Sequence, residues 1–245
     1  MEDYKDLKAI WEGELPLDQI KWRNRSFKEF QLSNKHESKK KLNWDEHMKD
    51  YPNDYDGKLL FLDNFQFKDN YIYLDISFVK FSTIIFMVKN KIPVKKGIGM
   101  LGTQCLIFSP NKEFILVGER SLSQSYYPGA IVNVGGMLEL DDLKKTPKEA
   151  LMREAYEETQ LNLKSDAFLK AILVGWNNVS VTFLISTTLS SIYNFNPDEE
   201  VIPADKNEFE GNLHWLYIQD LKKLQQGKYL DGLFYYKSKL RNILI

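Results

Sequence analysis

The sequence predicts an α/β fold in which helices cover both faces of a mixed β-sheet, preceded by a smaller β-rich subdomain. With 43% hydrophobic residues in 245, the chain can form a sizeable core. Strand-like apolar runs flank one strong helical pattern, which is typical of an α/β sandwich. The charged stretch 89–96 contains Pro93 and predicts a boundary between an N-terminal α+β subdomain, 1–96, and a second domain, 97–245.

The N-terminal subdomain shows weaker patterns than the rest of the chain. Residues 1–57 are polar, and a short helix is predicted over 43–50 because Pro52 and a turn-rich segment follow it. Consecutive strands are predicted over 58–88, since polar and apolar residues alternate along 71–78. This subdomain is therefore expected to be mainly β.

The second domain has clearer signals, and its strongest element is a helix. Thr146 is a good N-cap, Pro147 suits the first helical position, and Glu149 completes a capping box. The predicted strands are 101–108, 114–117, 130–134, 168–174, 179–185 and 213–218, and the predicted helices are 146–159, 219–226 and 233–241.

Composition and spacing exclude several classes of protein. The net charge of −1 gives no global attraction for nucleic acid, which is an unlikely partner, and the lone Cys105 in an apolar run is expected to be a buried thiol. The polar start and short apolar stretches indicate neither a signal peptide nor a membrane span, so a cytoplasmic location is expected. The GxGxxG match at 97–102 lacks the helix that a dinucleotide site requires, and the histidines lack zinc-ligand spacing.

The helix 146–159 carries three carboxylates on one face. At 100° per residue, Glu157 and Glu158 each lie within about 60° of Glu154, on either side of it. Their repulsion is relieved by a cation, and hard oxygen ligands suit Mg²⁺ or Mn²⁺. Arg153 is placed to orient one of these carboxylates. A solvated acidic face is the alternative for a Glu-rich helix taken alone.

The segment from Gly136 to Leu161 resembles the signature of the Nudix superfamily, GX5EX7REUXEEXGU, where U is a bulky apolar residue. Gly136 matches the first glycine and 153–158 matches REUXEE. Asp142 stands where the motif has its first Glu, and ten residues rather than seven then precede Arg153. A three-residue insertion is therefore predicted in 141–145, and Gln160 replaces the last glycine.

The resemblance implies a Nudix-type α/β/α sandwich and a hydrolase that directs water onto a diphosphate bond, with Mg²⁺ or Mn²⁺ as cofactor. Arg153 would hold Glu154, which would be a metal ligand, a base, or both. Glu210 is chosen as a further acid because it precedes the strand containing Trp215, with Glu208 second. The implied catalytic residues are Arg153, Glu154, Glu157 and Glu158, and the implied metal ligands are Glu154, Glu157, Glu158, Glu210 and the carbonyl of Gly136.

The substrate implied is a nucleoside diphosphate derivative. The N-terminal region and segment 207–221 resemble UDP-glucose-type pyrophosphatases, whose products would be UMP and a sugar 1-phosphate. An ADP-ribose-type pyrophosphatase, an inactive nucleotide-binding module and, more remotely, a messenger RNA decapping enzyme stay open, as does a homodimer. The candidate substrate-binding residues are Arg120, Tyr126, Tyr127 and Trp176.

Overall fold

A computed structural model describes residues 8–33, 36–92, 98–124, 128–175, 179–190, 195–204 and 208–223. The strands are β1 (Lys8–Pro16), β2 (Ile20–Glu29), β3 (Lys58–Lys68), β4 (Tyr71–Lys80), β5 (Gly99–Phe108), β6 (Phe114–Glu119), β7 (Ile131–Val132), β8 (Phe168–Gly175), β9 (Ser180–Thr188) and β10 (His214–Tyr217). The α-helices are α1 (Glu37–Asp50), α2 (Phe81–Lys89) and α3 (Pro147–Thr159), and the short 3-10 helices are η2 (Leu17–Gln19), η4 (Leu140–Lys144) and η5 (Ile218–Lys223).

The strands form one mixed sheet whose main path runs β1-β8-β9-β5-β3-β4-β2, with β6, β7 and β10 beside it. The β5–β9 and β2–β4 pairs are parallel, and the other strand pairs are antiparallel. Strands β1 and β2 lie at opposite ends of this path, yet only the three residues of η2 separate them in the chain. The sheet must therefore curl until its two ends meet at η2.

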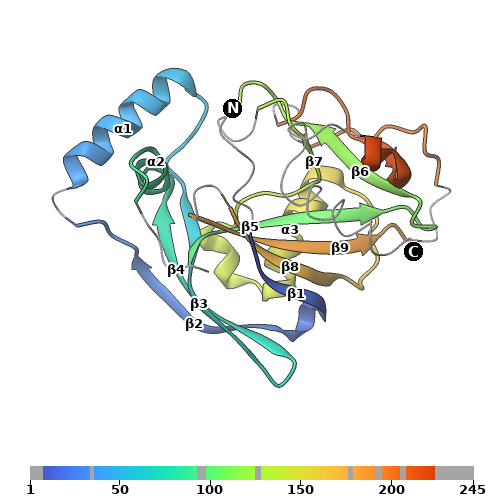
Figure 1. Ribbon diagram of the computed structural model, residues 1–245, viewed down its shortest axis with the longest axis horizontal. Coiled ribbons are helices and arrows are strands. Elements are labelled where there is room, and N and C mark those ends of the chain that lie inside the picture. Colours follow the sequence, from blue (N-terminus) through green and yellow to red (C-terminus); the bar gives the residue numbers. More distant parts are fainter. Residues whose placement is uncertain are drawn as a thin grey trace.

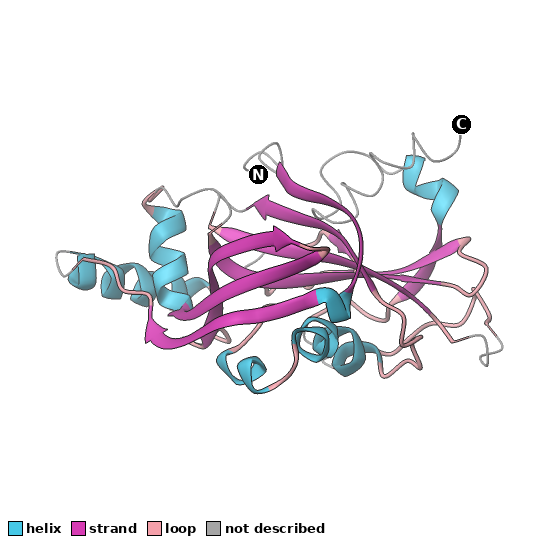
Figure 2. Ribbon diagram, turned by 90° about the horizontal axis from the view of Figure 1, so that it is seen from below, coloured by secondary structure: helices cyan, strands magenta, loops and turns pink. Residues whose placement is uncertain are grey.

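Helices cover both faces of this sheet. Alternate residues of β5, including Leu101 and Cys105, pack in one core with Leu151 and Met152 of α3. On the opposite face α2 packs at one end and η5 at the other, each in its own apolar cluster. Figure 1 shows α1 and α2 far from η5, and Figure 2 shows α3 and η5 on opposite sides of the sheet. The predicted α/β fold with a mixed sheet is confirmed.

The N-terminal strands pair with strands of the second half of the chain. Strand β1 pairs along its length with β8, and β3 pairs with the start of β5. Further along, Trp22 Nε1 donates to the carbonyl of Lys145 at 3.0 Å, and an Arg25 guanidinium nitrogen donates to that of Leu143 at 3.0 Å. The predicted boundary at residue 96 falls within 93–97, outside the described residues, and stays a prediction.

The strand predicted over 81–88 is wrong, because this segment is helix α2. A short apolar run has no period that separates a buried strand from a buried helix. The helix start is fixed instead by a distant residue. Asp56 accepts hydrogen bonds from the Ser82 N–H at 2.7 Å and from its hydroxyl at 3.0 Å.

Two other predicted helices differ from those observed. Helix α1 begins at Glu37, six positions before the predicted start at residue 43, and the prediction over 219–226 meets the 3-10 helix η5, which is described to residue 223. The prediction over 233–241 lies outside the described residues. The predicted strands of the second domain are confirmed, although β7 is only two residues long.

The surface and core agree with the predictions from composition. Cys105 is buried, and burial raises the pKa of its thiol, so the predicted structural thiol is confirmed.

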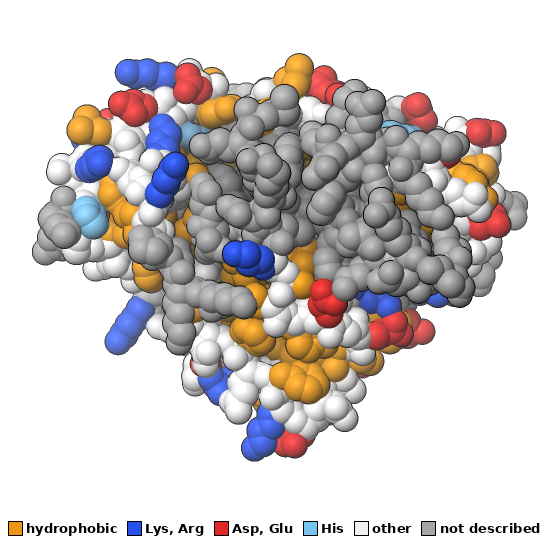
Figure 3. All heavy atoms as spheres, viewed as in Figure 1, with side chains coloured by type: hydrophobic (Ala, Val, Ile, Leu, Met, Phe, Trp, Pro, Cys, Tyr) orange, Lys and Arg blue, Asp and Glu red, His pale blue; other side chains and the backbone are white. Residues whose placement is uncertain are grey.

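Figure 3 shows positive and negative side chains intermixed on one face of the molecule. On this face, apolar side chains gather toward the β3–β4 hairpin, and the exposed Phe67 belongs to that hairpin. Among the described residues, no helix is long and apolar enough to span a bilayer.

Candidate functional site

Helix α3 has the local structure that its sequence predicts. The Thr146 hydroxyl accepts the Glu149 N–H at 3.3 Å, and the Glu149 carboxylate accepts the Thr146 N–H at 2.8 Å. Pro147 occupies the first turn, and Ala150 and Leu151 are fully buried. These contacts fix the helix axis and rotation, and therefore the directions in which its glutamates point.

Arg153 is the centre of an ion-pair network at the start of the site. Its Nε donates to both carboxylate oxygens of Asp142, at 3.0 and 3.2 Å, and another nitrogen donates to the Met137 carbonyl at 3.0 Å. The same guanidinium pairs with Glu154 at 2.6 Å and with Glu157 at 2.8 Å. Arg153 therefore contacts Glu154 through a planar fork that can set its orientation, and the catalytic part that the resemblance implies for both residues stays a prediction.

Asp142 has a structural role that the sequence did not predict. Only 1% of its surface is exposed. Its carboxylate accepts hydrogen bonds from the side chains of Arg153 and Lys145 and from the backbone N–H of Glu139. The predicted insertion is folded into the 3-10 helix η4, whose N-terminal turn is closed by this carboxylate. The extra residues therefore leave an acid in contact with Arg153 where the motif has glutamate.

A second carboxylate cluster lies on the other side of Glu154. Glu158 is 5% exposed, and neither of its carboxyl oxygens has a hydrogen-bond partner among the described residues. Burial and the adjoining Glu208 carboxylate raise the pKa of Glu158 well above its usual value. Burial also raises the pKa of Glu154 to about 7, with Glu208 contributing and Arg153 opposing. Buried acids in this state are stabilised by a proton or by a cation.

Glu157 points away from this cluster. Its side chain is 58% exposed and pairs with Arg153 one turn earlier. The structure thus brings Glu154 and Glu158 together with Glu208, and leaves Glu157 on the outer side of the helix. Among the described residues, no three His, Cys, Asp or Glu side chains converge tightly enough to form a ready metal cage.

The unpartnered Glu158 oxygens nevertheless fit a divalent cation. Mg²⁺ typically takes one or two protein carboxylates and completes its shell with water and substrate phosphate rather than with an all-protein cage. Glu158 and Glu154 supply such a pair, and Glu208 stands beside them. The donor set is hard oxygen only, which suits Mg²⁺ or Mn²⁺.

Gly136 is needed because Glu154 passes directly over it. A Cβ atom at this position would lie 2.6 Å from the carboxyl carbon of Glu154, so any larger residue would displace the acid. The Gly136 carbonyl accepts the Thr103 N–H at 2.9 Å. This bond occupies one lone pair of the carbonyl that the sequence assigned to the metal shell.

Glu210 is not where the sequence interpretation expected the further acid. Its exposed carboxylate accepts the Leu122 N–H at 2.9 Å, and this bond lowers the pKa of Glu210. Glu208, the second choice, pairs with Arg120 at 3.1 Å and adjoins Glu158. The two acids flank Phe209, which bridges to Arg120, and Glu208 lines the cavity that Arg120 also lines, whereas Glu210 is not among its described lining residues.

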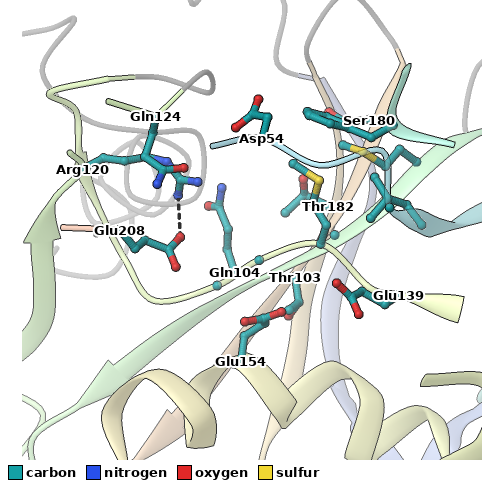
Figure 4. A pocket seen from close by; sticks show the side chains of 18 of the residues that line it. Asp54, Thr103, Gln104, Arg120, Gln124, Glu139, Glu154, Ser180, Thr182 and Glu208 are labelled. Carbon is teal, nitrogen blue, oxygen red and sulfur yellow. Dashed lines mark ion pairs between the residues drawn. The ribbon is translucent and has the colours of Figure 1, made fainter. Parts of the chain in front are cut away.

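Glu154 and Glu208 line a cavity of about 570 Å³, which is in the range of small-molecule sites. Figure 4 shows Arg120, Gln124 and Glu208 on one side, Ser180, Thr182 and Glu139 on the other, and Glu154 below, between the two groups. The described lining residues include 53–55, Gly57, Leu59, Phe81, Met100, 102–104, Asn133, Gly135 and Met137.

Of the predicted substrate-binding residues, Arg120 lines this cavity, whereas Tyr126, Tyr127 and Trp176 lie outside the described residues. Sequence interpretation missed Ser180 and Thr182, although a signal exists. Both are polar residues at positions of β9 whose side chains are buried. Polar residues at such positions require partners and frequently mark a site.

The family model of the NUDIX domain matches residues 100–234, more than half of the chain. The chain therefore belongs to the NUDIX domain family. This confirms the predicted superfamily and the predicted class of enzyme, a pyrophosphohydrolase. No curated protein matches the sequence.

Several solved structures are similar to this chain. The MutT protein from Methanosarcina mazei is 14% identical, with 62% of this chain and 99% of that chain covered and a TM-score of 0.42. A Nudix hydrolase from M. smegmatis, RenU, is 16% identical over 60% and 84% of the two chains, at a TM-score of 0.39. A bifunctional NMN adenylyltransferase/ADP ribose pyrophosphatase from Francisella tularensis, complexed with AMP and a manganese ion, is 15% identical over 66% and 49%, at a TM-score of 0.39.

Proposed function

We propose that this protein is a metal-dependent hydrolase that cleaves the diphosphate bond of a nucleoside diphosphate derivative, with a UDP-sugar as substrate and UMP and sugar 1-phosphate as products. The observation that carries the proposal is the buried, unpartnered carboxyl of Glu158 beside Glu154 and Glu208. Glu154 and Glu208 line the cavity and Glu158 is buried beside them, and such a group of acids repels a phosphate substrate unless a cation offsets its charge.

In this proposal Glu154 and Glu158 hold the cation, with Glu208 beside them. When bound, a divalent cation would offset phosphate charge and lower the pKa of a bound water. Arg153 keeps the Glu154 carboxylate in a fixed orientation through its 2.6 Å ion pair. The resemblance also implies that Glu154 acts as a base toward the attacking water. Arg120 faces the same cavity and is placed to contact phosphate oxygens.

The test is a substrate panel of nucleoside diphosphate sugars, dinucleotides and nucleoside triphosphates, with Mg²⁺, with Mn²⁺ and with EDTA. UDP-glucose is expected to give UMP and glucose 1-phosphate, resolved by chromatography, with no turnover in EDTA. Inorganic phosphate as the sole first product would contradict cleavage of a diphosphate bond. ADP-ribose as the preferred substrate would replace the UDP-sugar assignment and retain the mechanism.

A nucleotide-binding module without hydrolysis is the second candidate. Two observations favour it: Glu157 is turned out toward Arg153, and the described acids form no ready cage. Such a module would bind nucleotide, measured by calorimetry, while leaving every member of the panel intact. Turnover of any member with Mg²⁺ or Mn²⁺, abolished by EDTA, eliminates this candidate.

A further inference from the structure

The sheet face that carries α2 and η5 has a polar gap between its two apolar clusters. Met100 and Val179 belong to the cluster under α2, and Leu106 and Leu184 belong to the cluster under η5. Between them on β5 and β9, the residues on this face are polar or lack a side chain, and they form the cavity floor. These residues are Gly102, Gln104, Ser180 and Thr182.

Ser180 is the most informative residue of this floor. It is 3% exposed and lines the cavity, and its hydroxyl has no hydrogen-bond partner among the described residues. Burying an unpaired hydroxyl destabilises a fold, whereas alanine would fit the same position without that cost. Thr182 stands two residues along the same strand and lines the same cavity. A hydroxyl buried without a protein partner, at the wall of a cavity, is available to a ligand.

The charges around Ser180 indicate which part of a ligand lies there. This end of the cavity is lined by Tyr55, which donates a hydrogen bond to the Glu139 carboxylate, and by Asp54. Among the described lining residues the one cationic side chain is Arg120, which lies on the opposite side (Figure 4). Glu208 lies on that other side and Glu154 lies between the two, but there the cation would offset their charge, whereas the carboxylates at the Ser180 end would repel a phosphate and accept hydrogen bonds from hydroxyl groups. The Ser180 end therefore favours an uncharged group with several hydroxyls.

We propose that this end of the cavity is the sugar subsite, with Ser180 as a specificity-determining residue. This inference rests on the proposed function and names the part of the substrate that each end receives. The diphosphate lies between Glu154 and Arg120, and the sugar lies over β9. Tyr55 and Phe81 line this subsite from the N-terminal region, which gives that region a part in substrate selection.

The test is the variant Ser180→Ala, with affinities for UDP-glucose and UDP measured by calorimetry in Ca²⁺, which takes oxygen ligands and offsets phosphate charge, under conditions in which chromatography detects no turnover. UDP-glucose is expected to bind about fivefold more weakly, the effect of one hydrogen bond between uncharged groups, and UDP within about twofold of wild type. The melting temperature should stay equal or rise, because the hydroxyl has no protein partner to lose. A purely structural role for Ser180 would lower the melting temperature and leave the two affinities in their original ratio.

Ser186→Ala is the matched control, since Ser186 is also buried, lies on β9 six residues further along, and does not line the cavity. It should leave both affinities unchanged. Equal weakening of UDP-glucose and UDP by Ser180→Ala, or weakening of neither, overturns the sugar subsite. Selective weakening in a protein that hydrolyses nothing supports the subsite and overturns the hydrolase. A wild type that binds neither ligand overturns both.

Discussion

The two sides of helix α3 differ in whether their charged side chains are paired. On the side of η4, Arg153 pairs with Asp142 and Glu157, and each charge has a partner. On the side of the cavity, Glu158 is buried without a hydrogen-bond partner among the described residues, beside Glu208. Glu154 belongs to both sides, because it pairs with Arg153 and its pKa is raised by burial and Glu208.

This contrast separates two roles within one motif: one set of charged residues stabilises the geometry of the site, and the other set is available to bind a cation or transfer a proton. A satisfied network stabilises a geometry, and its loss is felt first as lost stability. A group of buried acids without counter-charges costs stability and is available to bind a cation or move a proton. The same six-residue stretch 153–158 therefore supplies both a fixed support and the reactive face.

The largest effect is expected from Glu158→Gln. It removes the buried charge on the cavity side, so kcat should fall by at least about 10²-fold, given the several kcal/mol that metal-borne charge stabilisation contributes. The melting temperature should not fall, since the change removes a carboxyl group whose charged form is disfavoured by burial and by Glu208. Glu157→Gln is the matched change one residue away, and it should lower kcat by about tenfold or less. Equal losses of kcat in the two variants would contradict the difference in role between the two sides of α3.

The next largest effect is expected from Asp142→Asn. Removing one charge from a buried pair leaves Arg153 under-compensated, so the free energy of unfolding should fall by about 3 kcal/mol. Activity should fall by about tenfold, because Glu154 loses part of its support. Asp141→Asn is the control: the Asp141 carboxylate is 79% exposed, and its ion pair among the described residues is with Lys144 in the next turn, so both stability and activity should stay unchanged. Denaturant titration and initial rates check both variants, and a stable Asp142→Asn would contradict the supporting part of this network.

A smaller effect is expected from pH acting on Glu154. Its folded-state pKa of about 7 exceeds the unfolded value of about 4.5, so on raising the pH the unfolded chain loses this proton first. Glu154 therefore reduces stability progressively between about pH 4.5 and 7. Without metal, the melting temperature of Glu154→Gln minus that of wild type should rise by several degrees over this range and then level off. A difference that is constant with pH would show that Glu154 titrates normally.

The smallest effect is expected at the end of α3, beyond both charge clusters. Gln160 has φ 53° and ψ 18°, the left-handed conformation that favours glycine at a helix C-terminus. Gln160→Gly should therefore raise the free energy of unfolding by about 1 kcal/mol or less and leave kcat within about threefold. If this variant instead switched on hydrolysis in an inert wild type, the residue would be an inactivating feature.

Local sequence predicted α3 well and α2 poorly, for one physical reason. The cap of α3 lies within four residues, 146–149, whereas α2 is capped by Asp56, 26 positions before Ser82. Likewise, helical geometry predicted that Glu154 and Glu158 share a face. The choice of Glu208 over Glu210 depends on tertiary contacts that no local pattern contains: Glu208 pairs with Arg120, whereas Glu210 accepts the Leu122 N–H.

The site shows the same limit. The Nudix motif located Arg153 and its neighbours, since they follow one another on one helix. The cavity floor is assembled from β5 and β9, whose pairing places Gly102 beside Thr182. Ser180 and Thr182 were recognisable only as polar residues in an apolar strand, and their common cavity required the sheet register.

The pairing of β1 with β8 sets the order in which the sheet can form, because these two strands are far apart in the chain. Strand β1 is synthesised early, yet its pairing partner is β8, and the ion pair between Glu14 and Lys170 joins residues 156 positions apart. At typical rates of synthesis, β1 must wait on the order of ten to thirty seconds before β8 leaves the ribosome. Pairings of such long range also slow the folding of the released chain. During that interval the hydrogen-bonding edge that β1 later offers to β8 is unpaired.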